Sequence, residues 1–578
     1  MPLRSSNGEK TPLPGRFLLV LVFAALGSIS LVSAWLAPNH YPPWTSFHGE
    51  SAAFAALCCF CLARWAQPEG VIAGRAPPLV LAFLALIWIQ WSTGQIPYRG
   101  DALLSSLYIV GLGMAWCLGL NSVGLRGKID PIAWLGTLVI VAAVVSVFIG
   151  LLQWLRMEIV LGVLAAERGP DMRVYANVGQ PNHLATLLLM ATVFAAALNI
   201  RGWLKGWHLA GLVIWFSIGL TFTESRSALL AAFAIGALVL VKGRTVPALG
   251  GWRLVAAWWL LLVVLALLWS PLNEALYLQP PREAVLTRDH ARQVMWRQSL
   301  AAIGESPWLG YGWRQTMAAQ KVGAEFVPGW LATDYAHNIV LDILLWVGVP
   351  LGLFILGAAG WSLVRAGLRV RGPEQMFLFA ASIPLLVHSL FEFPFAYSYF
   401  LFPGGWMLGA LYRLQRFDTA AVDDRPQPGT RYGALAATLL FALVAGAVAS
   451  EYMEAEEDYR VMRFELRRVG RTPQGYAAPE LPLLTQLDEL LKLGRLKPRA
   501  GMPAQTLERL RVGSASFGWA TLHLSYAVAL GLNGQAAQAA HQLALLRAVY
   551  GEDAYRQAKR LFLEARQQFP ELAVVEVK

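Results

Sequence analysis

The pair His337 and Asn338 opens an apolar segment and is the clearest candidate for acid–base chemistry. A neutral imidazole can accept a proton from an attacking hydroxyl group near neutral pH, so His337 is a candidate activator of an acceptor hydroxyl. A histidine beside an asparagine at the start of a helix can equally be a cap or an interfacial contact. The pair alone leaves both interpretations open.

Arginines on the expected outer side cluster in three places, where they could hold an anionic group near a membrane surface. They are Arg156, Arg168 and Arg173; Arg226; and Arg282, Arg288, Arg292, Arg297 and Arg314. Arginine suits phosphate because its planar guanidinium donates two parallel hydrogen bonds and stays charged. Arg226 lies in a short tip, 223–227, between two apolar segments, so it has little freedom. An ion pair with Glu224, or contact with lipid headgroups, would explain these charges without a bound ligand.

A polar run, Gly-Gln-Pro-Asn-His at 179–183, precedes another apolar segment. Its proline is typical of a first helical position, which would place Gln180, Asn182 and His183 at the outer mouth of the protein. An N-cap by Asn182, with His183 merely interfacial, is the alternative. Glu392 ends a further apolar segment. An acid at that depth is costly and often functional, although it could simply pair with an arginine.

Apolar segments long enough to cross a hydrocarbon core of about 30 Å recur along most of the chain. Hydrophobic residues make up 56% of the sequence and charged residues 14%, well below the roughly 25% charged residues of a soluble domain. We therefore expect an all-α polytopic membrane protein with about 13 transmembrane helices. The expected spans are 17–36, 51–66, 77–92, 102–121, 132–155, 182–200, 207–223, 227–241, 253–270, 338–360, 375–391, 395–412 and 433–450.

Basic residues are distributed among the loops as the positive-inside rule requires. With a cytoplasmic N-terminus, the inner loops carry paired cations such as Arg201 and Lys205, whereas the outer loops 37–50 and 388–394 hold no lysine or arginine. The net charge of +11 therefore indicates orientation in a bilayer rather than nucleic-acid binding. We expect a multi-pass bacterial inner-membrane protein with its active site and C-terminal region on the periplasmic side.

Two outer regions are large enough to do more than connect spans. Residues 271–337 form a loop, and residues 451–578 form a polar, helix-rich tail that follows the last expected span. We therefore expect a transmembrane catalytic domain at 1–450 and a helical periplasmic domain at 451–578. The spacing from Trp519 to Ala540 approximates a tetratricopeptide-like helix pair, so the tail is expected to be TPR-like.

Several common cofactor and metal motifs do not occur in the sequence: there is no Walker loop, Rossmann fingerprint, HExxH zinc site or Asp-x-Asp pair in the outer loops. We therefore expect no cofactor and no metal ion. Because nucleotide sugars are cytoplasmic, an energy-rich donor that is available outside should already be attached to a lipid.

Five runs of sequence, taken in order, resemble one superfamily of membrane glycosyltransferases. Residues 179–186, GQPNHLAT, resemble the signature of PglL-type protein O-oligosaccharyltransferases, and 388–394 also looks PglL-like. Three further runs resemble the wider superfamily of O-antigen ligases and Wzy polymerases. They are Ser225–Ala228, the stretch from Arg292 and Trp296 to the PWLGYG run at 307–312, and His337–Asn338 with the following Gly348 and Pro350.

The resemblance implies a GT-C-type fold and a metal-independent transfer of a glycan from an undecaprenyl-diphosphate carrier to an acceptor hydroxyl. By matching position, His337 would activate the acceptor, while Arg226 and Arg292 would bind the diphosphate, where charge develops as the glycosidic bond breaks. Gln180 would be a further active-site residue, and Arg297 competes with Arg292 for the diphosphate. The polar residues that complete the expected substrate-binding set are Asn182, His183, Asn338 and Glu392.

The acceptor separates the subfamilies. PglL-type enzymes glycosylate Ser or Thr of proteins such as pilins, ligases modify lipid A core, and polymerases extend another lipid-linked glycan. The run at 179–183 and the long tail favour a protein acceptor. The expected partners are therefore the lipid-linked oligosaccharide, a pilin-like protein and membrane lipid, with no nucleic acid. A transporter of lipid-linked glycans is the alternative outside the enzyme class, and it predicts charges near the middle of spans, whereas most lie at the ends.

Overall fold

The computed structural model describes residues 14–67, 70–72, 74, 76–123, 130–169, 173–243, 251–278, 283–417, 429–472 and 475–577, excluding the side chains of 14–15, 251, 283–289 and 417. Part of the expected outer loop, 279–282, lies outside these residues. The described chain is helical, with no β-strand in any of these ranges. Its N-terminal helices are α1 (Pro14–Leu36), α2 (Phe47–Trp65), α3 (Ala76–Ser92), α4 (Arg99–Ser122), α5 (Pro131–Trp154), η1 (Glu158–Leu164), α6 (Pro181–Ile200), α7 (Gly206–Thr223), α8 (Arg226–Lys242) and α9 (Gly251–Ala275).

The second half of the chain continues with the large outer loop, the last apolar helices and the tail. Its helices are α10 (Glu283–Glu305), α11 (Thr316–Phe326), α12 (Ile339–Val347), α13 (Val349–Leu368), α14 (Pro373–His388), η3 (Pro394–Ala396), α15 (Ser398–Phe417), α16 (Thr430–Arg467), α17 (Thr485–Arg495), α18 (Ala504–Ser516), α19 (Ala520–Leu532), α20 (Ala536–Gln568) and η4 (Pro570–Val574).

Eight helices in the described part of the chain are long and apolar enough to cross a membrane: α1, α4, α5, α6, α7, α9, α13 and α16. Helices α2, α3, α8, α14 and α15 occupy the other expected spans. The expectation of an all-helical polytopic protein is therefore confirmed, whereas the count of thirteen crossings and the GT-C topology stay predictions.

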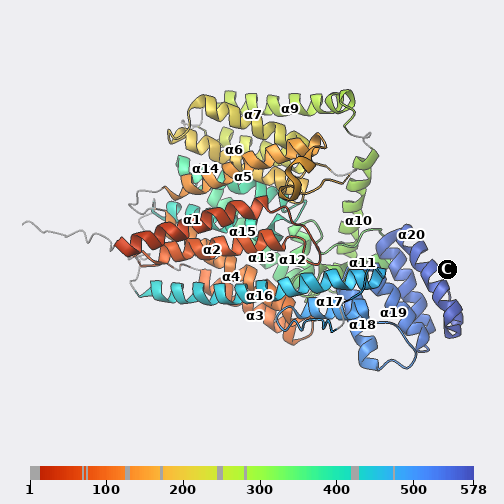
Figure 1. Cartoon of the computed structure of the whole chain (residues 1–578). Coiled ribbons are helices and arrows are strands. Elements are labelled where there is room, and N and C mark those ends of the chain that lie inside the picture. The colour runs from red at the N-terminus through yellow and green to blue at the C-terminus, as the bar shows by residue number, and fades with distance from the viewer. Residues whose placement is uncertain are drawn as a thin grey trace, which may run out of the picture.

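Helix α6 lies at the centre of the bundle, and its position follows from its sequence. Its most apolar window is 83% buried, against 11% for α9 and 6% for α13. Small and apolar residues on every side of α6 let it pack against α5, α7, α14 and α8. Helices α9 and α13 instead expose large apolar side chains, as expected for surfaces that face lipid. The start of α6 is therefore held rigidly among its neighbours (Figure 1).

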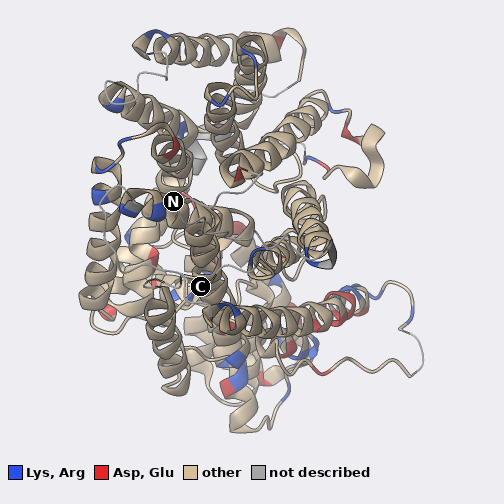
Figure 2. Cartoon of the chain, turned by 90° about the vertical axis from the view of Figure 1, so that its left-hand side faces the viewer, with Lys and Arg blue, Asp and Glu red and all other residues tan. Residues whose placement is uncertain are grey.

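Charged side chains are sparse along the bundle. Figure 2 looks onto the end where the N-terminus lies, and its Lys and Arg residues gather at helix ends and in loops, while most of the ribbon carries no charge. Arg201 pairs with Asp130 at 2.6 Å and with Glu374 at 3.1 Å, which links the C-terminal end of α6 to the N-terminal ends of α5 and α14.

The expected span 338–360 is two helices rather than one. Helix α12 ends and α13 begins at Gly348, whose φ is +78°, in the left-handed region that favours glycine. A Cβ at this position would lie 2.3 Å from the carbonyl oxygen of Trp308, so no other residue fits without a shift. The break leaves the Val349 N–H free to donate to Pro307 O at 2.7 Å. A continuous apolar run conceals this interruption in the sequence.

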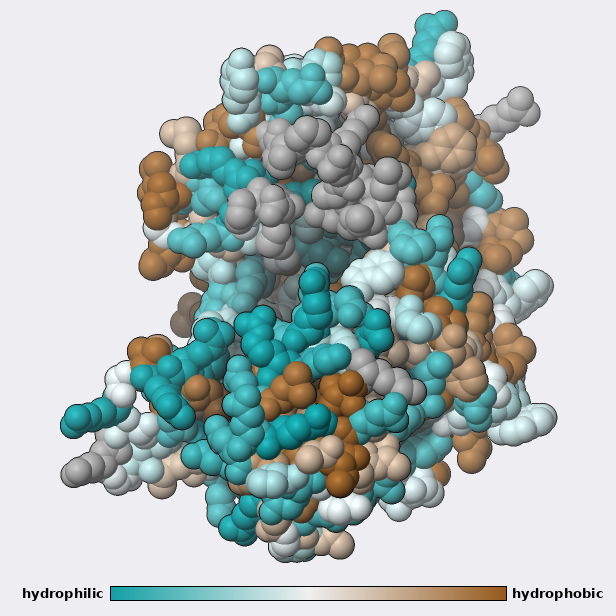
Figure 3. All heavy atoms as spheres, turned by 90° about the vertical axis from the view of Figure 1, so that its right-hand side faces the viewer, coloured by the Kyte–Doolittle hydropathy of each residue, from teal (hydrophilic) through white to brown (hydrophobic). Residues whose placement is uncertain are grey.

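The tail is joined to the bundle by an uninterrupted helix. Helix α16 runs from the last expected span through position 450 to Arg467. Helices α17–α20 then pack beside the outer loop, with α11 against α18 and α20, and they form the blue end of the chain in Figure 1. Seen from that end, hydrophilic side chains gather on the lower half of the surface, and the face is hollowed above them (Figure 3).

Candidate active site

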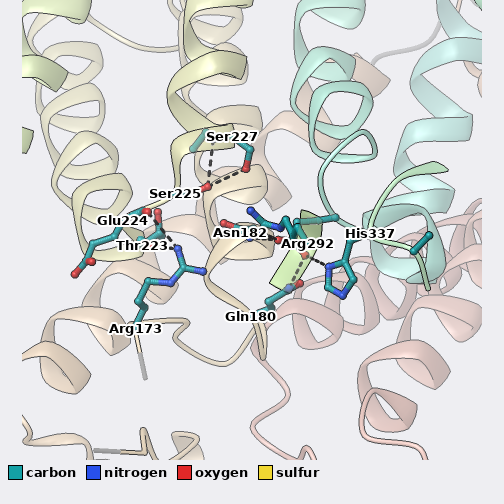
Figure 4. A network of polar contacts seen from close by, with 12 residues as sticks. Arg173, Gln180, Asn182, Thr223, Glu224, Ser225, Ser227, Arg292 and His337 are labelled. Atoms are coloured by element: carbon teal, nitrogen blue, oxygen red, sulfur yellow. Dashed lines mark hydrogen bonds and ion pairs between the residues drawn. The ribbon is translucent and has the colours of Figure 1, made fainter. Parts of the chain in front are cut away.

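The carboxylate of Glu392 is the centre of a polar network that joins four segments of the chain. It lies in the turn after α14, and its side chain is 2% exposed. It accepts hydrogen bonds from Gln180 Nε2 at 2.9 Å and from Asn182 Nδ2 at 2.6 Å. Its Oε2 lies 2.8 Å from Nδ1 of His337, and its Oε1 forms an ion pair with Nη2 of Arg292. Figure 4 shows Gln180, Asn182, Arg292 and His337 turned toward one another.

Helix ends deliver these side chains to one place. Gln180 and Asn182 flank Pro181, the first residue of the central helix α6. The preceding Gly179 has φ +84° and packs against the ring of His40, an approach that a side chain would block. Arg292 comes from α10, and Glu392 follows α14, where its N–H donates to His388 O at 2.7 Å. The polar network therefore rests on rigid elements rather than on loops alone.

Glu392 is ionised in this setting. Burial alone would raise the pKa of its carboxyl group, but the hydrogen bond from His337 and the charges of His337 and Arg292 outweigh burial and lower it to about 2. A carboxylate cannot donate, so Nδ1 of His337 must carry the hydrogen of their 2.8 Å contact. This fixes the tautomer of the neutral ring and leaves Nε2 as its acceptor.

His337 and Asn338 have distinct structural roles. The backbone of His337 has φ +53°, a conformation that is uncommon for a residue other than glycine. Asn338 caps α12, because its Oδ1 accepts the N–H of Val340 at 2.9 Å. The cap interpretation of Asn338 therefore holds in the structure, and the cap fixes the chain just after His337.

Among the described residues, His183 forms no hydrogen bond with the Glu392 network. Its ring is 1% exposed, and within the described residues neither nitrogen has a hydrogen-bond partner. It packs edge-on against Tyr397 at 4.5 Å and against Phe393 and Phe400. The structure therefore places His183 among aromatic side chains, one of which, Phe393, also contacts His337.

Arg292 and Arg297 differ sharply, although both lie on α10. At about 100° per residue, five positions rotate one side chain roughly 140° from the other. Arg292 reaches Glu392, with 30% of its side chain exposed. Arg297 is exposed and forms no hydrogen bond or ion pair with any residue that the structure describes.

Arg226 lies outside the Glu392 network but on a neighbouring helix end. It is the first residue of α8, it is exposed, and Ser225 caps that helix. Helix α8 packs against both α6 and α14, whose ends carry Gln180 and Glu392. The tip between α7 and α8 is held by Arg173, whose Nη1 donates to Thr223 O at 3.0 Å and to Glu224 O at 3.2 Å. Figure 4 shows Arg173 between this tip and the Glu392 network.

An aromatic wall, which no sequence motif indicates, lies beside His337. Phe393 contacts the His337 ring edge-on at 4.7 Å and stacks on Tyr335 at 4.9 Å. Tyr397 continues this wall by stacking on Phe393 at 5.8 Å. The aromatic residues at 393, 395 and 397 are visible in the sequence, but the contacts of Phe393 and Phe395 with Tyr335 depend on the tertiary fold. The residues described by the structure contain no group of three or more His, Cys, Asp or Glu side chains that could hold a metal ion.

Comparison with known proteins relates this arrangement to glycan-transferring families. Three family models match the chain in succession: "Protein glycosylation ligase" at 174–198, "O-Antigen ligase" at 211–356 and "Virulence factor membrane-bound polymerase, C-terminal" at 376–562. The first covers the run around Gln180, and the second covers Arg226, Arg292 and His337.

Two curated relatives come from Acinetobacter baylyi. A "General O-oligosaccharyltransferase" is 26% identical over 557 residues, which covers 93% of this chain and 93% of that protein. A "ComP-specific O-oligosaccharyltransferase" is 28% identical over 394 residues, which covers 66% of this chain and 70% of that protein. Both the transmembrane region and the tail therefore have counterparts in the first relative.

Proposed function

We propose that this chain, which the comparisons identify as a PglL-type O-oligosaccharyltransferase, transfers an oligosaccharide from a lipid carrier to Ser or Thr hydroxyls of proteins. The carrier proposed here is undecaprenyl diphosphate, and the reaction takes place at the periplasmic face of the inner membrane. The observation that supports this proposal best is the Glu392 network. The carboxylate of Glu392 contacts both His337, whose tautomer it sets, and Arg292. Arg226 lies at the start of the neighbouring helix α8.

His337 is proposed to act as the general base. Its Nε2 accepts the proton of the acceptor hydroxyl as that oxygen attacks the anomeric carbon, and Glu392 stabilises the imidazolium that forms. The bond between the anomeric carbon and the diphosphate oxygen breaks, and the diphosphate leaves with the bonding electron pair. Direct displacement predicts inversion at the anomeric carbon. The proton on His337 then passes to the departing diphosphate or to water.

Arg226 and Arg292 are proposed to bind the diphosphate. Negative charge grows on the leaving group in the transition state, so positioned guanidinium groups there lower the barrier. Arg292 uses Nη2 for Glu392, and its other N–H groups remain to donate to phosphate. Arg226 is exposed at the start of α8, where the positive end of the helix dipole also favours an anion. Gln180 and Asn182 hold Glu392 in place and act as positioning residues.

Protein glycosylation is favoured over the other reactions of the superfamily. The protein glycosylation ligase match covers the Gln180 run, and both relatives are named as O-oligosaccharyltransferases. The O-antigen ligase and polymerase matches over 211–356 and 376–562 keep ligation to lipid A core and chain extension as alternatives. A GT-C topology, metal-independent transfer and the division into domains at 1–450 and 451–578 are further parts of the proposal.

A reconstituted transfer assay tests this function. Purified protein would receive an undecaprenyl-diphosphate oligosaccharide and either a pilin or lipid A core, with EDTA present. We expect glycan on the pilin, lost in His337→Ala and retained in His541→Ala, a matched variant of an exposed tail histidine. Transfer only to lipid A core would refute the protein acceptor, and full activity of His337→Ala would refute the assigned base. Activity that disappears in EDTA and returns with a divalent cation would refute metal independence.

A further inference from the structure

The guanidinium group of Arg168 is buried and forms no hydrogen bond with any residue that the structure describes. Arg168 follows η1 in the segment between α5 and α6, and 5% of the residue is exposed. None of its three side-chain nitrogens has a hydrogen-bond partner within the described structure. Burying a charged group without compensation is expensive, so such a residue is usually paired. Arg168 is therefore poised for an anion that binds there.

The hydrogen bonds that neighbouring side chains make with Arg168 go to its backbone. Glu158 Oε1 accepts the Arg168 N–H at 3.2 Å, and Arg156 Nη1 donates to Arg168 O at 3.4 Å. Among the described residues no ion pair joins the side chains of Glu158 and Arg168. Burial lowers the pKa of Arg168, and so does the charge of Arg156, while Glu158 and Glu224 act in the opposite direction.

An exposed apolar segment adjoins this site. The η1 residues Ile159, Val160, Val163 and Leu164 are 72%, 71%, 88% and 67% exposed. This run directly follows α5, one of the helices long and apolar enough to cross a membrane. Apolar side chains beside basic residues are typical of segments that lie in the membrane interface. This segment therefore offers a surface for acyl or polyprenyl chains next to the Arg168 guanidinium.

We propose that Arg168 and the η1 segment form a docking site at which the diphosphate and polyprenyl chain of the lipid-linked donor bind on the way from the bilayer to Arg226. The inference rests on the proposed function, because it takes the donor to be a polyprenyl diphosphate. The polyprenyl chain lies against η1, and the diphosphate supplies the anion that Arg168 lacks. Arg173, which links this segment to the tip before Arg226, continues the basic path inward.

Donor binding by the full-length protein in neutral phosphatidylcholine nanodiscs tests the site. Undecaprenyl diphosphate would be titrated against the wild type, Arg168→Gln and Arg560→Gln, a matched charge removal at an exposed tail residue. We expect the affinity to fall about tenfold in Arg168→Gln, because a charge-assisted fork is lost, and to stay unchanged in Arg560→Gln. We also expect the Tm of Arg168→Gln to equal or exceed that of the wild type, since an unpaired buried charge is removed.

Unchanged donor affinity in Arg168→Gln would overturn the proposal. So would a defect confined to phosphatidylglycerol binding in mixed nanodiscs, which would make this a site for bulk anionic lipid. If Arg168→Gln does not fold, a photocrosslinker attached to Val163→Cys provides a second test. We expect the crosslinker at position 163 to capture far more radiolabelled polyprenyl diphosphate than the same crosslinker at Val241, a 75% exposed residue on α8. Equal capture at both positions would refute the site.

These measurements separate this inference from the proposed function. Binding and crosslinking need no transfer, so they can be made even if no acceptor is glycosylated. Loss of transfer in His337→Ala together with unchanged donor binding in Arg168→Gln would refute the docking site and leave the transferase. Specific binding without transfer to any acceptor would refute the function and leave the lipid site.

Discussion

Nδ1 of His337 lies 2.8 Å from Oε2 of Glu392, and this contact sets the direction in which the imidazole can act. Because the carboxylate is ionised, Nδ1 carries the hydrogen and Nε2 is available to an acceptor hydroxyl. The same carboxylate also holds Gln180, Asn182 and Arg292. The base and the group proposed to bind the diphosphate therefore share one anchor, so a change at Glu392 should affect both.

Glu392→Gln should lower kcat about 10- to 100-fold, as is typical when the partner that orients a histidine is lost. The amide keeps the shape but cannot compensate the charges of Arg292 and of protonated His337. Steady-state transfer kinetics would measure this, with Glu454→Gln on an exposed face of α16 as the matched control. Glu392→Asp should recover part of the loss. A fall in Tm with kcat unchanged would assign Glu392 a purely structural role.

The pH dependence of stability follows from the same carboxyl group. The pKa of Glu392 is lowered from its ordinary value of 4.5 to about 2, so folding favours the ionised form. Its contribution to the free energy of unfolding is complete above pH 4.5 and is lost as the pH falls toward 2. We therefore expect the Tm values of the wild type and Glu392→Gln, measured by thermal unfolding between pH 3 and pH 7, to approach one another as the pH falls. Parallel curves would show that the carboxylate charge is not stabilising.

Arg226→Lys should reduce kcat/KM by about 100-fold, the order seen when a single donor to a developing anion is removed. An ammonium group keeps the charge but cannot donate two parallel hydrogen bonds to phosphate. Arg253→Lys, at an exposed position near the start of α9, is the matched control. Normal transfer by Arg226→Lys would show that positive charge alone suffices at the start of α8.

Much of the site was predictable because each polar residue stands at the end of an apolar run. Gln180, His337 and Glu392 are conspicuous for that reason, and their shared location at one side of the bundle follows from the order of the spans. Their convergence on Glu392 was not predictable, because it joins residues separated by 55 to 212 positions. The break at Gly348 was hidden because apolar residues continue on both sides of it.

Local geometry also separates residues that stand close together in the sequence. Five residues along α10 rotate Arg297 away from the face on which Arg292 meets Glu392. His183 shares the run of Gln180 but belongs to the buried face of α6, where Tyr397 and Phe400 enclose it. The face of a helix that contacts its neighbours depends on tertiary packing. The sequence of an amphipathic or uniformly apolar helix does not by itself specify that face.

Asn338→Ala should destabilise the protein by about 1 kcal/mol through loss of the α12 cap, and it should lower activity by displacing His337. Asn338→Asp keeps an oxygen that can accept the Val340 N–H, so it should restore both stability and most of the activity. Thermal unfolding and transfer kinetics on the two variants distinguish a cap from a ligand-binding amide. An Asp variant that is stable but inactive would indicate that the amide itself contacts substrate.

Lys321 should make the docking of the tail sensitive to pH. Its Nζ on α11 donates to Ser514 O and, at 2.9 Å, to Phe517 O, and burial lowers its pKa from 10.5 to about 7. Between pH 7 and pH 10.5 the Lys321 amine is neutral in the folded state and charged in the unfolded state. The unfolded state therefore binds more protons, and the free energy of unfolding rises with pH.

We expect amides around Phe517 to exchange hydrogen more slowly, relative to their intrinsic rates, at pH 9 than at pH 7. Lys321→Met should flatten this difference, whereas Lys492→Met, at an exposed tail lysine, should preserve it. Protection that is independent of pH in the wild type would show that the Lys321 amine keeps its charge when the tail is docked.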